Sequence, residues 1–375
     1  MPRASKAITA SRGALRRLEA HVRGLSAYAA GPTPRGGVHV WYGHARVPTM
    51  REWAIGGMVK LQHLSARYPN EPRCNILYLV TSRLPEAASV LADWARRRGA
   101  RLVVNQNGVA YPAWAGTATD AINAPMRELL SRADHVFYQS EFCRLSADRF
   151  AGPPAAAFEV LYNPVDTSRF VPAPPRQAAR TLTLLLAGSQ DQWYRFASAV
   201  DTLAQLTARG VDARLLITGR LGWNKDPDTA RSEADRLMTE RRVADRVELV
   251  GRYTQADAPA IFQRADIVLH TKYNDPAPTA VLEALSCGCP VVYSKTGGVP
   301  ELVGDDAGIG IEAPLSWDRA IAPDASALAD AVCRVRESLR RYADAARARA
   351  VERFDVRQWL DRHRAVFEAL VAGHA

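Results

Sequence analysis

Cysteine is scarce in this chain, and the chain has no long apolar run. Its five cysteines among 375 residues are scattered and odd in number, which argues against a disulfide framework and favours a reducing compartment. Cys287 and Cys289 have no second pair, so we predict no bound metal. No apolar stretch approaches the roughly 18 residues that span a membrane, and no apolar core follows the basic N-terminus, so we expect neither a membrane span nor a signal peptide.

The chain also lacks the short motifs of several nucleotide-binding enzymes. Neither a GxGxxG nor a Walker A sequence occurs, so a dinucleotide-dependent dehydrogenase and a P-loop enzyme both lose their main support. Asp226-Pro227-Asp228 matches an acidic metal-binding pattern, but it lies among polar residues and is expected to form a solvated loop.

Negative charge is short in the first half of the chain. Residues 1–170 hold 22 Lys and Arg residues against 12 Asp and Glu residues, so the whole formal net charge of +10 lies there. Either this is an arginine-rich solvated surface, or it contacts anionic lipid headgroups or an anionic acceptor. Nucleic acid is not an expected partner, because no nucleic-acid-binding motif occurs. We expect a cytoplasmic protein, with peripheral contact at the inner membrane face as a further hypothesis.

The N-terminal 36 residues bear on that hypothesis. Leu15, Leu18 and Val22 recur at helical spacing among arginines, before a Gly-Pro-Thr-Pro break at 31–34. A basic amphipathic helix of this kind can rest on a membrane, and the alternative is a leader helix or a disordered segment.

Strand and helix patterns alternate along the rest of the chain and predict an α/β protein of about two domains. We place the first domain at residues 1–170 and the second at 181–354, with the proline-rich residues 171–180 as the linker. Buried strands are expected at 38–42, 75–80, 102–104, 136–140, 158–162, 182–186, 214–218, 247–250, 267–269 and 290–293.

The stretch 268–304 is the most informative. A loop with Asp275 follows a buried strand, and an apolar helix that contains Glu283 follows the loop. Both carboxylates can face one crevice at the carboxyl ends of parallel strands, where such folds bind ligands. The helix begins between them, and its dipole and first N–H groups attract a phosphate. The residues expected to present these N–H groups are Pro278, Thr279, Ala280 and Val281.

A carboxylate pair beside an anion site suits a nucleotide-activated sugar, since one carboxylate can bind ribose hydroxyls and the other sugar hydroxyls. At Glu283, at the Gly-Cys-Pro-Val-Val sequence of 288–292 and at the Gly-Gly-Val-Pro-Glu sequence of 297–301, the chain resembles the retaining glycosyltransferases of family 4 (glycosyl transferase group 1), which have the GT-B fold. Asp275 stands where this family has a glutamate, and its loop is Asn-Asp-Pro-Ala-Pro instead of Glu-Gly-Phe-Gly. The chain therefore resembles a divergent branch.

The resemblance implies a donor-binding role for residues in the first half as well. Gly56 and Gly57 follow the first strand, where the family's backbone approaches the donor phosphate or the acceptor. Gln106 or Asn107 stands where the family often has a histidine that bonds to the donor sugar, and a structural amide turn is the alternative.

In the second half, the resemblance aligns Gly188 with the glycine after the first strand of the donor domain. The family's arginine and lysine on the donor diphosphate fall at Ser189 and Tyr194, which are not basic. Arg195 is one residue late and either reaches the phosphates or is a surface arginine. Arg252 lies where the family stacks the nucleotide base.

As a whole, the resemblance implies two Rossmann-like domains that face a central cleft. Residues 355–375 are expected to form a last helix that crosses back and completes the first domain. The implied activity is that of a retaining, hexosyltransferase-type enzyme that uses a nucleoside diphosphate sugar and a glycan, lipid-linked or small-molecule acceptor. No metal or other cofactor is implied, because the helix dipole and basic side chains can stabilise the departing diphosphate. The alternatives are a catalytically silent nucleotide-sugar-binding protein, a phosphorylase or a sugar-nucleotide epimerase.

Overall fold

The computed structural model describes residues 18, 22, 33–34, 36–54, 56–174 and 181–373. Most of the predicted N-terminal helix and residues 175–180 of the predicted linker therefore lie outside the described residues. The rest divides into two compact units. The first takes in the residues up to Thr49, those from 56 to Leu161, and those from Gln358 on, and the second takes in Met50–Ala54 and Tyr162–Arg357. The sequence analysis placed the end of the first domain at residue 170 and the return of the chain to this domain at residue 355, whereas the structure places these bounds at Leu161 and Gln358.

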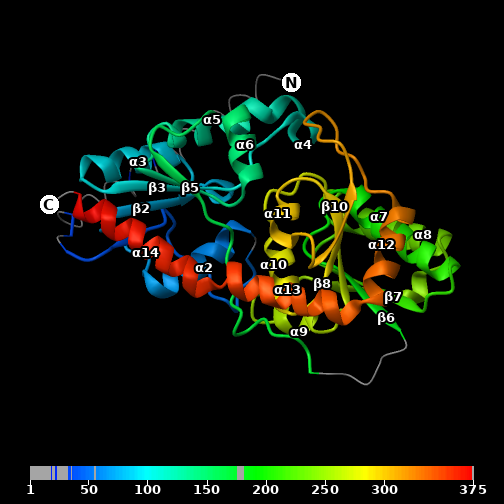
Figure 1. Ribbon diagram of the computed structural model, residues 1–375. Helices are drawn as coiled ribbons and strands as arrows, with labels where there is room; N and C mark the ends of the chain where they lie inside the picture. The colour runs from blue at the N-terminus through cyan, green and yellow to red at the C-terminus, as the bar shows by residue number, and fades with distance from the viewer. Residues whose placement is uncertain are drawn as a thin grey trace, which may run out of the picture. The chain divides into compact units, whose positions relative to one another are not determined.

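The first unit is built on a parallel sheet with the strand order β1-β2-β3-β4-β5 (Figure 1). Its strands are nearly continuous apolar runs, as expected for a parallel sheet that is covered on both faces. Their bounds are Val40–Trp41, Ile76–Val80, Arg101–Gln106, His135–Tyr138 and Ala157–Val160. Its α-helices are α2 (Gly57–Arg67), α3 (Ala88–Arg97), α4 (Pro112–Ala115), α5 (Thr119–Leu130), α6 (Glu141–Phe150) and most of α14 (Val356–Ala372).

Helix α14 completes the first unit, as the sequence predicts. Its side chains Trp359, Val366 and Phe367 are buried in one apolar cluster with Val40, Tyr78 and other residues of the first sheet. His363 lies in the same interface, where its Nε2 is 3.0 Å from the Tyr78 hydroxyl. The end of the chain is thus a part of the first core.

The second unit has a parallel sheet with the strand order β11-β10-β9-β6-β7-β8. The chain runs outward from β6 through β7 and β8, and then returns to place β9 on the other side of β6, with Leu186 opposite Leu269. The order of strands therefore reverses between β6 and β9, and such a switch point is where open α/β sheets bind ligands. The strand bounds, from β6 to β11, are Leu182–Leu186, Ala213–Thr218, Val247–Gly251, Ile267–His270, Val291–Lys295 and Gly308–Glu312.

The helices of the second unit include one that the sequence analysis placed in a loop. Asp226 is the N-cap of α8, and its carboxylate accepts hydrogen bonds from the N–H groups of Asp228 and Thr229. The Asp-Pro-Asp pattern is thus a helix start, for which aspartate followed by proline is a common signal. The helices are α7 (Trp193–Ala208), α8 (Pro227–Glu240), α9 (Ala258–Phe262), α10 (Thr279–Ser286), α11 (Val299–Val303), α12 (Ala325–Glu337) and α13 (Leu339–Arg353).

Candidate donor-binding site

The polar residues of the second unit gather where β6 and β9 end. Gly188 follows β6 with a φ of 84°, a conformation that favours glycine, and its N–H donates to Thr218 Oγ1 at 3.0 Å. After β9, residues 271–278 form the loop that leads into α10. Since the two strands are neighbours and parallel, these segments meet at one edge of the sheet.

The Asp275 carboxylate is buried among positive groups. Its Oδ2 lies 3.1 Å from Lys272 Nζ and 3.3 Å from His270 Nε2. Burial by itself would raise the pKa of Asp275, but Lys272, His270 and Arg195 outweigh burial and hold the pKa well below its usual value. Asp275 is therefore ionised at every physiological pH.

The Asp275 loop is fixed from both sides. The Thr271 hydroxyl donates to the backbone oxygen of Arg195 at 2.8 Å, and the Tyr273 N–H donates to the Tyr194 hydroxyl at 2.9 Å. On the other side, a Cβ atom at Gly297 would lie 2.4 Å from the backbone oxygen of Asp275, so only glycine fits there. Tyr194, which stands in place of a basic family residue, thus holds the loop to α7.

Arg195 is buried, with 6% of its surface exposed, so the alternative of a surface arginine is wrong. Its Nη1 donates to the backbone oxygen of Ser189 at 2.5 Å, and its buried Nε has no hydrogen-bond partner among the described residues. Burial lowers the pKa of Arg195, while the Asp275 charge opposes that change. The guanidinium therefore adds a positive charge beneath the site.

Glu283 lies in the second turn of α10 and is 4% exposed. Its Oε1 accepts a hydrogen bond from Gln255 Nε2 at 2.9 Å. Burial raises the pKa of Glu283 to about 7, although the Gln255 amide opposes the rise. Glu283 is therefore poised to change charge near neutral pH. Gln255 was not predicted, because nothing in its sequence surroundings indicates a contact 28 residues away.

The start of α10 corrects one part of the sequence analysis. Pro278 is the N-cap and has no N–H group, and the Val281 N–H donates to the Pro278 oxygen at 3.1 Å. Only the N–H groups of Thr279 and Ala280 lack a backbone acceptor among the described residues, so two donors replace the four that were expected.

Arg252, the residue expected at the base, is exposed at the end of β8. Its guanidinium lies over the ring of Trp53, 5.0 Å from the ring centroid. Trp53 belongs to Met50–Ala54, the short segment that packs with the second unit. Sequence reasoning gave no role to Trp53.

The predicted residues of the first unit lie at the carboxyl edge of its own sheet. Gly56 is the N-cap of α2, and a Cβ at Gly57 would lie 2.6 Å from Ser82 Oγ, so close packing explains this second glycine. Asn107 is 7% exposed, and its backbone N–H donates to Thr81 Oγ1 at 3.0 Å.

A buried lysine beside Asn107 was missed by the sequence analysis. Lys60 is 1% exposed, and its Nζ donates to Asn105 Oδ1 at 2.5 Å and to Gln139 Oε1 at 3.0 Å. In the amide orientation that satisfies both groups, Asn107 also accepts from Lys60 at 2.9 Å. Burial lowers the pKa of Lys60 to about 7. The available signal was the position of Lys60 among the apolar residues Met58, Val59 and Leu61, which follow Gly57.

Comparison with known proteins assigns the second unit to a family. Residues 175–349 match the family model "Glycosyl transferases group 1". This chain contains a glycosyl transferases group 1 domain. The matched range contains Gly188, Arg195, Asp275 and Glu283.

Curated relatives agree with this domain. The phosphatidylinositol N-acetylglucosaminyltransferase gpi3 subunit of Schizosaccharomyces pombe is 24% identical over 182 residues, which are 48% of this chain and 38% of that protein. The D-inositol 3-phosphate glycosyltransferase of Salinispora arenicola is 30% identical over 195 residues, which are 46% of this chain and 43% of that protein. The chain thus spans less than half the length of these relatives.

Solved structures show the fold of most of the chain. HepE of Anabaena, solved in complex with UDP and glucose, has a TM-score of 0.64 and 21% identity over 83% of this chain and 81% of that chain. Sucrose-phosphate synthase of Thermosynechococcus elongatus has a TM-score of 0.64 and 18% identity over 84% of this chain and 77% of that chain. The predicted fold class, GT-B with two Rossmann-like α/β domains, is confirmed.

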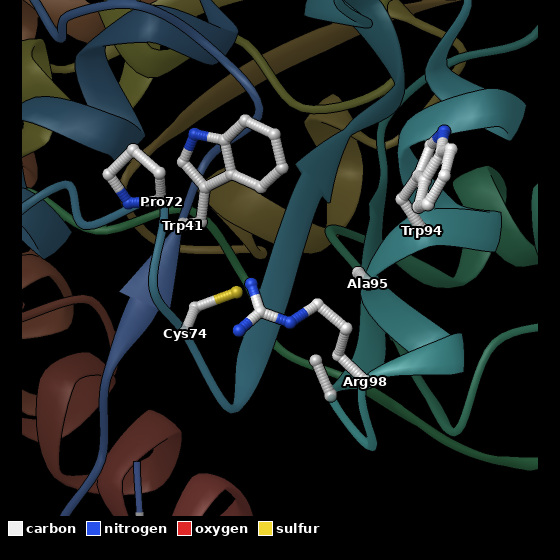
Figure 2. A pocket seen from close by; sticks show the side chains of 7 residues that line it. Trp41, Pro72, Cys74, Trp94, Ala95 and Arg98 are labelled. Atoms are coloured by element: carbon white, nitrogen blue, oxygen red, sulfur yellow. The ribbon is translucent and has the colours of Figure 1, made fainter. Parts of the chain in front are cut away.

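A small pocket of the first unit lies near the start of β2 and β3, away from the predicted residues at the carboxyl ends of the strands. Its lining includes Trp41, Trp94, Cys74 and Arg98, and Cys74 and Ala100 precede β2 and β3 (Figure 2). Burial raises the pKa of the Cys74 thiol to about 12, so this cysteine is not a nucleophile at neutral pH.

None of the described helices is long and apolar enough to cross a membrane. Within the same residues, no group of three or more His, Cys, Asp or Glu side chains is arranged to hold a metal ion.

Proposed function

We propose that this protein transfers a glycosyl group from a nucleoside diphosphate sugar to an acceptor, with retention of the anomeric configuration. The observation that carries the proposal is the pair Asp275 and Glu283, which flanks the start of α10 at the switch point of a glycosyl transferases group 1 domain. HepE, which shares the fold, was solved with UDP and glucose and with UDP-glucose, and this supports a nucleotide sugar as the donor class.

In this proposal, Glu283 binds the ribose hydroxyls and Asp275 binds the hydroxyls of the transferred sugar. The N–H groups of Thr279 and Ala280, together with the dipole of α10, bind the diphosphate. Arg195 adds a positive charge from below. A departing diphosphate and an oxocarbenium-like sugar need positive dipoles that are in place before the reaction begins, and these groups supply them. A metal is not part of the proposal, because the dipole and cations can stabilise the leaving group.

A panel of nucleotide sugars, assayed by thermal shift, tests the donor class. A ligand at 100 times its dissociation constant stabilises the protein by about 2.7 kcal/mol, so the correct donor raises the melting temperature. Binding followed by transfer to an added acceptor supports the proposal. Binding without turnover on any acceptor favours the silent nucleotide-sugar-binding alternative, and no shift with any donor contradicts both.

We also propose that the basic N-terminal half contacts an anionic acceptor or an anionic membrane surface. Residues 1–35 hold seven of the Lys and Arg residues and one Glu, so they supply +6 of the net charge of +10. Peripheral association at the inner membrane face follows from this charge.

A further inference from the structure

The Asp275 cluster contains more positive than negative charge. The Asp275 charge acts on both Arg195 and Lys272, and the second carboxylate that acts on Arg195, Asp191, also pairs with Arg220 at 2.9 Å. Burial lowers the pKa of His270, which favours the neutral imidazole, while Asp275 opposes the change. Three cations, Arg195, Lys272 and Arg220, therefore share two carboxylates, and one of these cations, Arg195, is buried, where an unpaired charge is costly. An anionic ligand is the natural compensation.

Lys272 is the cation of this cluster that a ligand can touch. Its side chain is 36% exposed, whereas Arg195 is buried beneath it and bonded to Ser189. The neighbours of Lys272 in the chain are both tied to the first turn of α7, Thr271 through the Arg195 oxygen and Tyr273 through the Tyr194 hydroxyl. Because the backbone on both sides is fixed and Asp275 holds the ammonium, Lys272 loses little freedom when an anion binds.

The same loop leads into the start of α10, where the proposed function places the diphosphate. Lys272 precedes the Pro278 cap by one short loop, and the free N–H groups of Thr279 and Ala280 follow it. The buried Nε of Arg195, which has no partner among the described residues, belongs to the same cluster. Ser189 and Tyr194, where a basic pair was expected, use their oxygens for contacts inside the protein. The positive charge that these two positions lack is thus present on the loop after β9.

We infer that Lys272 binds the diphosphate of the nucleotide sugar, held in place by Asp275, with Arg195 as a second cation that does not touch the ligand. This inference rests on the proposed donor class. It assigns to a loop residue the task that the sequence analysis sought at the start of α7. The sequence analysis did not single out Lys272, because a lone lysine after a strand resembles an ordinary surface residue.

The test compares diphosphates with nucleosides. We would measure the dissociation constants of UDP, GDP, ADP, CDP and dTDP, and of the matching nucleosides, for the wild type and for Lys272→Met, Lys272→Arg and Lys225→Met. Lys225 is an exposed lysine of the same unit and is the matched control for loss of one charge. We expect Lys272→Met to weaken the diphosphate about 10- to 100-fold, as loss of a charge-assisted hydrogen bond does, and to leave the nucleoside unchanged. Lys272→Arg should retain most of the affinity, and Lys225→Met all of it.

Two outcomes overturn the inference while leaving the proposed function intact. One is wild-type binding of a diphosphate that Lys272→Met does not weaken, and the other is an equal loss of affinity for diphosphate and nucleoside. If the wild type bound none of the five diphosphates, the proposed function would fall, and the inference with it. If Lys272→Met did not fold, reductive methylation of the wild type decides the matter: the bound diphosphate should protect Lys272 and not Lys225, and equal labelling of Lys272 with and without it refutes the inference.

Discussion

At the scale of single residues, the candidate site is defined by the surroundings of two buried carboxylates, one in α10 and one in the loop before it. Glu283 is buried beside Gln255, and Asp275 is buried beside Lys272 and His270. Burial acts on both carboxylates, yet their pKa values move in opposite directions, because only Asp275 faces cations. Glu283 therefore titrates near neutral pH, while Asp275 stays ionised.

Glu283→Gln should weaken donor binding by roughly 1.5–3 kcal/mol, the usual range for a lost hydrogen bond to a charged group. In the wild type, donor affinity should rise as the pH rises through about 7, because the ionised carboxylate is the better acceptor for ribose hydroxyls. The variant should show no such rise. Calorimetric titration of the donor from pH 6 to pH 8 measures both effects.

Lys60 provides the control for this pH dependence, since its pKa also lies at about 7. Deprotonation of Lys60 removes a positive charge and would lower the affinity for an anionic donor as the pH rises, so Lys60→Met should retain the rise that Glu283→Gln loses. Wild-type affinity and kinetics in Glu283→Gln would contradict the role of Glu283 altogether.

Asp275 should act as a functional replacement for a glutamate. Asp275→Asn should lose most transfer activity, because it removes the charge that faces the sugar and leaves Lys272 and Arg195 without their carboxylate. Asp275→Glu should also lose activity, because Gly297 packs against the Asp275 backbone and leaves the loop no room to retreat from a longer side chain. Single-turnover transfer and donor affinity, measured side by side on folded protein, test both. Equal rates for Asp275→Asn and the wild type would contradict a functional role for Asp275.

At the scale of elements, α14 ties the end of the chain to the first sheet through buried aromatic side chains. His363 stacks on Trp359 and Phe137, with ring centroids 4.0 and 4.4 Å away. Its Nδ1 lies 2.9 Å from the Trp359 oxygen and its Nε2 lies 3.0 Å from the Tyr78 hydroxyl. This environment has no room for water around a charged imidazole, so the helix depends on a neutral histidine.

Burial lowers the pKa of His363 to about 3, whereas an unfolded histidine titrates near 6.5. Between these values the unfolded chain binds more protons, so the free energy of unfolding should fall as the pH falls below about 6.5. One pKa unit corresponds to about 1.4 kcal/mol, so lowering the pH from 6.5 to 5 should cost the first unit roughly 2 kcal/mol.

His363→Gln keeps a polar group for Tyr78 but cannot take up a proton, so its stability should change less over the same pH range. Urea unfolding followed by circular dichroism at pH 6.5 and 5 measures the difference. Glu159, whose ion pairs with His135 and Arg362 hold its pKa at about 2 despite burial, contributes mainly below pH 4.5 and does not confuse the comparison. Equal slopes for both proteins would mean that His363 does not limit acid stability.

At the scale of the whole molecule, the net positive charge lies in residues 1–170, whereas residues 171–375 carry no net charge. Some described arginines of the first unit pair with acids, as Arg132 does with Asp93 and Glu128, and as Arg144 does with Glu141 and Asp148. Residues 1–35, which are mostly outside the described residues, supply +6 of the net charge of +10. An anionic membrane surface is one partner that attracts such a segment.

Sedimentation with phosphatidylglycerol-containing vesicles at low and high salt tests this idea. Binding should be strong at low salt and weak at high salt, because salt screens charges at a surface. A chain without residues 1–35 should bind less at low salt and serves as the control, with neutral phosphatidylcholine vesicles as the second. Binding that is indifferent to salt, or no binding at low salt, would contradict the proposal.

The sequence by itself determined the alternation of strands and helices in this protein and singled out residues 268–304 as the candidate site. The strand Leu182–Leu186, for example, has the bounds that its apolar run predicts. The helix that contains Glu283 could also be predicted, with its start near Thr279 and its end before Gly288. Helix starts and stops depend on residues that are neighbours in the chain. The strand Gly308–Glu312 was missed, because two glycines hide its pattern.

Only the tertiary structure decided which of these residues are buried and what charges they face. The burial of Arg195, the Gln255 contact of Glu283 and the amide surroundings of Lys60 depend on segments far apart in the sequence. Lys272 became visible as a ligand-binding candidate only when Asp275 and Arg195 were found beside it. The physical reason is that desolvation and charge–charge interaction act through space, so the pKa and the free N–H groups of a site are properties of its packing and not of its local sequence.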